Sequence, residues 1–129
     1  MTALFALSCG LLGATSPALA AEKKHPASLV GDTEHGESIF KSICIHCHRT
    51  DYEDSAVGAP GLRDVLDRHD EAWLLQWIKG PAAFAEKDEK AKALTQSNPY
   101  GLVMPTIPEM QDAQNRRDII AFLKTLTDQ

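Results

Sequence analysis

The side chains with the clearest chemical potential are two cysteines and a histidine that fall within five positions, in the run Cys44-Ile45-His46-Cys47-His48. Thiols three residues apart on a helical turn lie on the same side of the backbone. From there they can form thioether bonds with the two vinyl groups on one edge of a haem, and this spacing is the signal for that attachment. The histidine after the second thiol is carried over the ring, where its imidazole reaches the iron. We therefore predict one haem, attached through Cys44 and Cys47 and ligated by His48.

Two other chemistries use the same side chains and are disfavoured. A redox-active dithiol is expected in a βαβ context, whereas the pattern of this chain is helical. A zinc site would combine both thiols with two of His46, His48 and His69. Ligands so close along the chain strain a tetrahedron, and there is no second cysteine pair. A disulfide across so short a loop would add little stability.

The N-terminal twenty residues are typical of an export signal. Residues 1–20 carry no charge, are rich in Ala, Leu and Gly, and end in Ala18-Leu19-Ala20, just before a polar stretch. This pattern predicts a signal peptide that is cleaved after Ala20 and a periplasmic location. The stretch departs from the usual pattern in one respect, because no Lys or Arg opens it.

The rest of the chain is predicted to hold a flexible leader at 21–31 and one domain at 32–129, which is the size of a single core. Attachment to a membrane is expected only if the N-terminal stretch is retained as an anchor or if Cys9 is lipidated. The 129 residues include 18 acidic and 13 basic side chains, for a formal charge of −5. This balance excludes a basic surface for nucleic acid and favours a partner with a positive docking face.

The hydrophobic spacing predicts an all-α chain. A first helix opens at Asp32 or Thr33 and runs into Cys44, and a short helical turn falls at 62–66. A stronger helix spans 70–79 and is stopped by Gly80-Pro81.

The C-terminal part of the chain is expected to be less regular before its last helix. The segment 82–103 is mixed, and its charged stretch 86–92 is interpreted as a solvated face. Three prolines hold 99–108 extended. The last helix is capped by Asp112 and buries a face that ends at Leu126.

From Gly36 to Leu126 the chain resembles a class I c-type cytochrome. The family pattern is a helix with a glycine and an aromatic residue, the haem motif, a proline loop, a helix with tryptophan, a Met-Pro pair, and an amphipathic C-terminal helix. All of these occur here in order. They are Gly36 with Phe40, Cys44 to His48, Pro60, Trp77, Met104-Pro105, and Asp112 to Leu126.

The resemblance implies a cytochrome c fold of about four helices around one covalently bound haem c. It implies Met104 as the second axial ligand of the iron, beside His48. It further implies that the Pro60 carbonyl accepts a hydrogen bond from His48 and that Trp77 reaches a haem propionate, a part that Trp73 could also play. Gly36 and Phe40 are expected to meet Phe122 where the first and last helices cross.

Other side chains could compete for the iron. Met110 lies close to the start of the last helix and is interpreted as packing. His35 and His69 are interpreted as surface histidines. A thioether such as that of Met104 favours ferrous iron, and a His/Met pair therefore raises the reduction potential.

The function expected from this reading is single-electron shuttling between redox partner proteins in the periplasm. With both axial positions filled, no substrate binds the metal, so the chain is not expected to be an enzyme. One alternative is a fixed haem subunit of a periplasmic oxidoreductase complex. A less favoured one is a haem sensor or peroxidase-like protein with an open sixth site.

Overall fold

The computed structural model describes residues 30–127. The predicted signal peptide and nearly all of the predicted leader lie outside the described residues. Within them the chain forms six α-helices, two short 3-10 turns and no strand. These elements are α1 (Thr33–Ser42), the 3-10 turn Cys44–His46, α2 (Val65–Arg68), α3 (Glu71–Lys79), α4 (Pro81–Ala85), α5 (Glu89–Ser97), the 3-10 turn Pro108–Gln111 and α6 (Ala113–Leu123). The all-α prediction is confirmed.

Four helices begin at an aspartate whose side chain caps them, and this explains where they start. The side chain of each N-cap aspartate accepts a hydrogen bond from a backbone N–H in the first turn that has no partner within the helix. The four pairs are Asp32 with His35, Asp70 with Trp73, Asp88 with Ala91, and Asp112 with Gln114.

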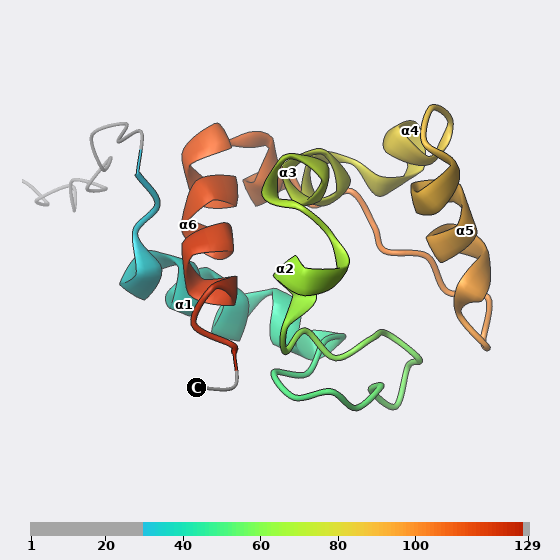
Figure 1. The fold of residues 1–129 in the computed structure, drawn as a ribbon, viewed down its shortest axis with the longest axis horizontal. Coiled ribbons are helices and arrows are strands. Elements are labelled where there is room, and N and C mark those ends of the chain that lie inside the picture. The colour runs from blue at the N-terminus through green and yellow to red at the C-terminus, as the bar shows by residue number, and fades with distance from the viewer. Residues whose placement is uncertain (1–29, 128–129) are drawn as a thin grey trace, which may run out of the picture.

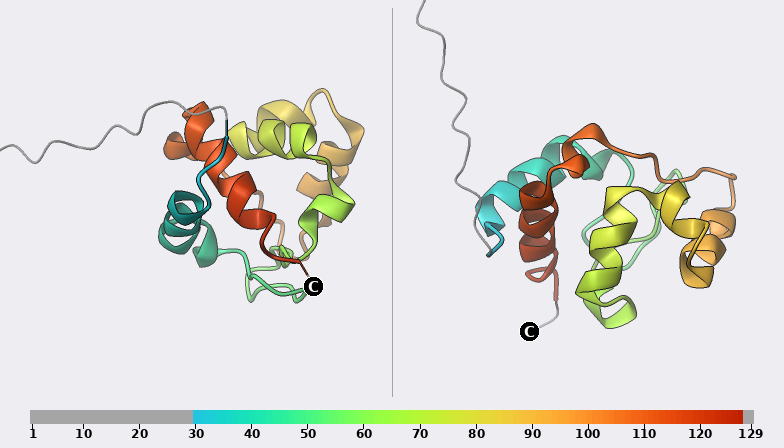
Figure 2. Two further views of the ribbon diagram at one scale, coloured as in Figure 1. Left: turned by 60° about the vertical axis from the view of Figure 1, so that its left-hand side comes forward. Right: turned by 90° about the horizontal axis from the view of Figure 1, so that it is seen from above.

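The molecule is elongated, with the α1–α6 pair at one end and the α4–α5 hairpin at the other (Figure 1). Helix α3 lies between them, as the two further views also show (Figure 2). The buried core is centred on α1, α3 and α6, and its members are Ile39, Phe40, Val65, Leu74, Ile78, Met110, Ile119, Ile120, Phe122 and Leu123. No helix within residues 30–127 is both long and apolar enough to cross a membrane.

The crossing of α1 and α6 depends on a glycine. A Cβ atom added at Gly36 would lie 1.9 Å from the carbonyl oxygen of Asp118, so the two backbones touch at this point. One turn later, the rings of Phe40 and Phe122 pack with their centroids 5.1 Å apart. The predicted contact of Phe40 with Phe122 is confirmed, whereas Gly36 meets the backbone of Asp118 and Ile119 instead.

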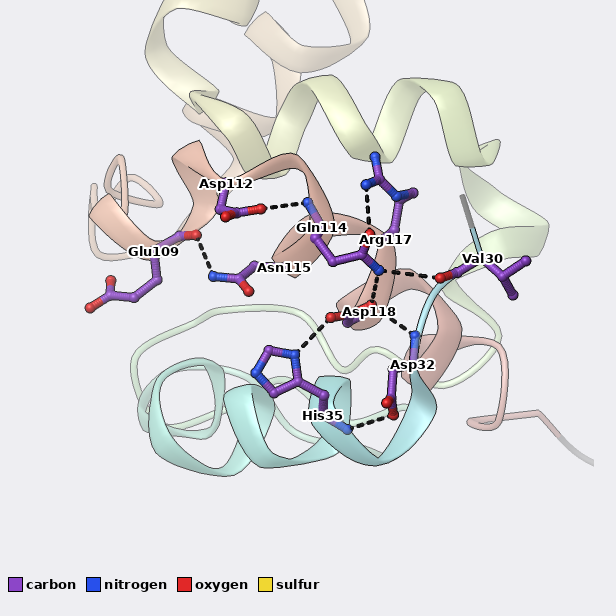
Figure 3. Close-up of polar contacts among 9 residues, drawn as sticks. All are labelled: Val30, Asp32, His35, Glu109, Asp112, Gln114, Asn115, Arg117 and Asp118. Carbon is purple, nitrogen blue, oxygen red and sulfur yellow. Dashed lines mark hydrogen bonds and ion pairs between the residues drawn. The ribbon is translucent and has the colours of Figure 1, made fainter. Parts of the chain in front are cut away.

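A buried carboxylate joins the same two helices (Figure 3). Asp118 on α6 is fully buried. It accepts hydrogen bonds from the Asp32 backbone N–H at 2.8 Å and from the Gln114 amide at 2.7 Å, and it pairs with His35 Nδ1 at 2.7 Å. Burial by itself would raise the pKa of Asp118, but these hydrogen bonds hold it below its usual range. The carboxylate therefore stays ionised within the α1–α6 interface.

Three expected boundaries are wrong. Helix α1 ends at Ser42, so Cys44 lies in the 3-10 turn that follows it. The short second helix covers Val65–Arg68 and not 62–66. The last helix ends at Leu123 and not at Leu126. The segment 82–103, which was expected to be mixed, contains most of α4 and all of α5, and Pro81 itself starts α4. Proline lacks a backbone N–H, which the first helical position does not need.

Candidate cofactor site

A cavity of about 350 Å³ lies between the two ends of the molecule and is lined mainly by apolar side chains. Five of the six predicted site residues line it, and these are Cys44, His48, Pro60, Trp77 and Met104. The sixth, Cys47, is exposed at the end of the 3-10 turn that starts with Cys44. The fold thus brings together residues that lie up to 60 positions apart in the chain.

His48 is held in the orientation that a metal ligand needs. Its Nδ1–H donates to the Pro60 carbonyl oxygen at 2.9 Å, so the predicted hydrogen bond is present. This bond selects the tautomer in which Nε2 carries a free lone pair. Burial lowers the pKa of His48, while the bond to Pro60 opposes that shift. The ring is therefore neutral and able to bind a metal through Nε2.

The two thiols lie on one 3-10 turn. Backbone N–H groups of Cys47 and His48 both donate to the Cys44 carbonyl, at 3.1 and 2.8 Å. Side chains three residues apart are eclipsed in such a turn, so both sulfurs lie on one side of it. Both cysteines are free thiols. Burial, and to a lesser extent the charge of Cys47, raises the pKa of Cys44 to about 11. A redox-active dithiol needs the opposite shift, so the environment disfavours that alternative.

The comparisons with known proteins agree with this geometry. The sequence profile of the family described as Cytochrome c matches residues 33–127. The chain belongs to the cytochrome c family. Covalently attached haem c is therefore its cofactor, and haem-based electron transfer is its general function. No curated protein sequence matches the chain.

Solved structures of cytochromes c from Rhodothermus marinus have the same fold. One is 26% identical with a TM-score of 0.63, over 73% of this chain and 75% of that chain. An engineered form is 26% identical with a TM-score of 0.61, over 73% and 76%. A second structure of the engineered form, described as bound to a carbene intermediate, is 24% identical with a TM-score of 0.59 and supports the fold alone.

The residues present fit a haem c. The cavity walls are apolar, as a porphyrin requires, and the imidazole of His48 presents an unprotonated Nε2 beside two unpaired thiols. His48 would supply an iron ligand, and Cys44 with Cys47 would supply the two sulfurs for thioether bonds.

The two tryptophans of α3 have different partners. The indole N–H of Trp73 donates to Asp88 Oδ1 at 3.1 Å, and its ring stacks on Trp77 with centroids 5.5 Å apart. Because this donor is already used, Trp73 is not available as the donor to a haem propionate. Trp77 also lines the cavity and is the remaining tryptophan for that role.

His69 is not the surface residue that the sequence suggested. Its ring stacks on Trp73 with centroids 4.3 Å apart and borders the cavity. Its Nδ1 is buried and has no hydrogen-bond partner within the described residues. Burial lowers the pKa of His69, and the nearby charges of Lys90 and Arg68 lower it further. His69 is therefore a neutral part of the cavity wall.

The other two competitors for the iron lie in the core or at the helix crossing. Met110 is buried in the core, as expected, and also borders the cavity. His35 is half-exposed and pairs with Asp118 at the α1–α6 crossing, away from the residues that line the cavity.

Three further residues that line the cavity or contact its wall were not predicted from the sequence. They are Asp88, Asn98 and Arg68. Asp88 lay in a charged stretch interpreted as solvated, yet it binds the indole of Trp73. Asn98 lines the cavity and donates to the Val57 carbonyl at 2.9 Å. Arg68 lines the cavity and donates to the Gly61 carbonyl at 2.7 Å. Nothing in the local sequence distinguishes these side chains from surface polar residues, because their partners are distant in the chain.

Proposed function

We propose that this cytochrome c is an exported, periplasmic monohaem electron carrier whose haem iron takes His48 and Met104 as axial ligands. The observation that carries the proposal is that Met104, 56 positions beyond His48, borders the same apolar cavity. His48 already has its Nδ1 occupied by Pro60, which leaves Nε2 for the iron. When bound, haem c supplies a one-electron ferrous–ferric couple.

The protein side of this function is binding, orientation and exclusion of water. Cys44 and Cys47 hold the cofactor covalently, so it is not lost by dissociation after export. The Pro60 carbonyl fixes the plane of the His48 imidazole. In this proposal the Trp77 indole donates to a haem propionate. The apolar cavity wall lowers the local dielectric and so tunes the reduction potential set by the axial pair.

The acidic composition supports transient docking with a partner that has a positive surface, because opposite charges speed association. The export pattern of residues 1–20 supports the periplasmic location. With His48 and Met104 both on the iron, no position is open to a substrate, so we propose that the protein is an electron carrier and not an enzyme.

The test is a pair of methionine variants of the purified holoprotein. In Met104→Ala we expect the covalent haem to remain and the ferric band of methionine ligation to disappear from the visible spectrum. The reduction potential is expected to fall, because the soft thioether stabilises ferrous iron. The matched control is Met110→Leu, which replaces a buried thioether with an apolar side chain of similar volume. This variant is expected to leave the band in place. A band that survives Met104→Ala assigns the sixth ligand to another residue.

A further inference from the structure

Helix α5 is attached to the rest of the molecule at its N-terminal end by Asp88. This residue is the N-cap of α5, and its Oδ1 accepts from the Ala91 N–H at 2.8 Å. The same oxygen accepts from the indole N–H of Trp73 on α3 at 3.1 Å. The Lys90 ammonium adds a hydrogen bond to the Arg68 carbonyl at 2.5 Å and lies 5.5 Å from the centre of the Trp73 ring. One carboxylate thus both starts α5 and ties it to α3.

Asn98 attaches the other end of α5. It is the C-cap of the helix, and its Nδ2 donates to the Val57 carbonyl at 2.9 Å. Its Oδ1 accepts from the N–H groups of Tyr100 and Leu102, at 2.8 and 3.2 Å. The amide therefore folds the turn that leads to Met104 while it contacts the loop that ends at Pro60.

The loop contacted by Asn98 is the one that orients His48. Gly58 in this loop has φ +71, and a Cβ added there would lie 2.9 Å from Pro99 Cδ and 3.0 Å from Asn98 Nδ2. Two residues later, the Pro60 carbonyl accepts the hydrogen bond from His48. The C-terminal end of α5 is thus packed against the loop that supports the iron-binding imidazole.

The face of α5 between these two attachments borders the cavity. Leu94, Thr95 and Ser97 line it from the helix, and Leu102, Val103 and Met104 line it from the segment that follows. Yet only Ala91 is buried among the residues of α5. The main helical neighbour of α5 is α4, so apolar packing against the core contributes little to the position of α5. The two end attachments must then do most of the positioning.

We infer that α5 is a strap across the haem cavity and that Asp88 and Asn98 are positioning residues for Met104. This inference rests on the proposed function, because it takes Met104 as the sixth iron ligand. The strap holds the segment 98–104 in place and keeps the thioether on the iron. Loosening either end increases the fraction of time in which Met104 is away from the metal, and an external ligand can then bind the vacated position.

The experiment measures carbon monoxide binding to the reduced holoprotein, because carbon monoxide binds ferrous haem only after Met104 leaves. Asp88→Ser keeps an N-cap oxygen for α5 but lacks the reach of the carboxylate toward Trp73. Trp73→Phe removes the indole donor and keeps an aromatic ring. Each is expected to raise the binding rate roughly tenfold. The loss of one hydrogen bond is expected to increase the population with Met104 off the iron by about that factor. The double variant is expected to match the single ones, because all three lack the same bond.

The other end of the strap is tested with an isosteric change. Asn98→Asp keeps the oxygen that accepts from Tyr100 and Leu102 but loses the donor to Val57, and it is expected to raise the rate by a similar factor. The matched controls are Glu89→Ser and Gln96→Glu, which make the same changes in charge at exposed positions of α5. These are expected to stay within about twofold of the wild type. Haem content and the ferric methionine band of every variant are recorded, so that misfolded protein is recognised.

The outcomes separate the strap from the proposed function. Slow carbon monoxide binding by the wild type, together with accelerated binding by Asp88→Ser and Asn98→Asp, supports the strap. Wild-type rates in both variants overturn the strap and leave the His/Met proposal standing. Fast binding by the wild type itself, with no further change in Met104→Ala, overturns both. Additive effects of Asp88→Ser and Trp73→Phe overturn the role assigned to their hydrogen bond.

Discussion

The two ends of this cytochrome c are held in different ways. At the α1–α6 crossing the backbones touch at Gly36, the rings of Phe40 and Phe122 pack, and the Asp118 carboxylate is fully buried. At the α4–α5 hairpin almost no residue is buried, and a few hydrogen bonds at the helix ends determine its position. The haem cavity lies between them. The difference indicates that the crossing contributes most to the free energy of global unfolding. The hairpin has a lower local stability, and in the inferred strap it controls access to the iron.

The largest expected effect is that of Gly36→Ala. The added methyl would overlap the Asp118 carbonyl oxygen, and neither backbone can move without opening the crossing. We expect the free energy of unfolding of the holoprotein to fall by at least ~3 kcal/mol, measured by chemical denaturation. The control is Gly80→Ala, where the new Cβ would be 4.0 Å from the nearest atom. Its effect is expected to stay within about 1 kcal/mol. Equal losses in the two variants would show that the crossing is not especially tight.

The next effect is that of Asp118→Ala. The change removes the acceptor of three hydrogen bonds. The bond from the Gln114 amide is buried, and those from the Asp32 N–H and the His35 ring are partly buried. We expect a loss of roughly 2–3 kcal/mol at neutral pH, with covalent haem and methionine ligation retained. If the loss of methionine ligation accompanies the loss of stability, the two ends of the molecule are more strongly coupled than the comparison implies.

The same variant has a pH signature with a definite sign. Hydrogen bonds keep the folded-state pKa of Asp118 below its ordinary value of 3.8 despite burial. The unfolded state therefore binds the proton more readily, and the stabilisation from this carboxylate is fully present above that ordinary value. It is lost as the pH falls through the folded-state pKa. Denaturation of wild type and Asp118→Ala should therefore give curves that converge in acid and stay apart at neutral pH. A constant difference at all pH values would contradict the assignment.

The smallest effect on global stability is expected from Asp88→Ser. Because Asp88 fixes only the hairpin, we expect no resolvable change in the denaturation midpoint, although carbon monoxide binding is accelerated. A midpoint shift as large as that of Asp118→Ala would instead place the hairpin in the same cooperative unit as the crossing.

The covalent part of the site could be predicted because its residues are neighbours in the chain. The two thiols and His48 fall within five positions, and aspartates marked the starts of α1, α3 and α6. The roles of Asp88, Asp118 and His69 could not be predicted. Each depends on a partner far along the chain or on its depth in the fold, and no local periodicity encodes such contacts. The end of α1, the bounds of α2 and the end of α6 were misjudged because helix boundaries respond to tertiary contacts as well as to propensity.

The sequence by itself determined the covalent chemistry of this protein, because the spacing of Cys44, Cys47 and His48 places three reactive groups on one turn whatever surrounds them. It also determined the helical class, through the spacing of apolar residues and the helix caps. Only the tertiary structure decided which tryptophan has a free donor, which carboxylate is buried and what covers the cavity beside Met104. Those properties come from contacts between distant segments, which exist only once the helices have packed.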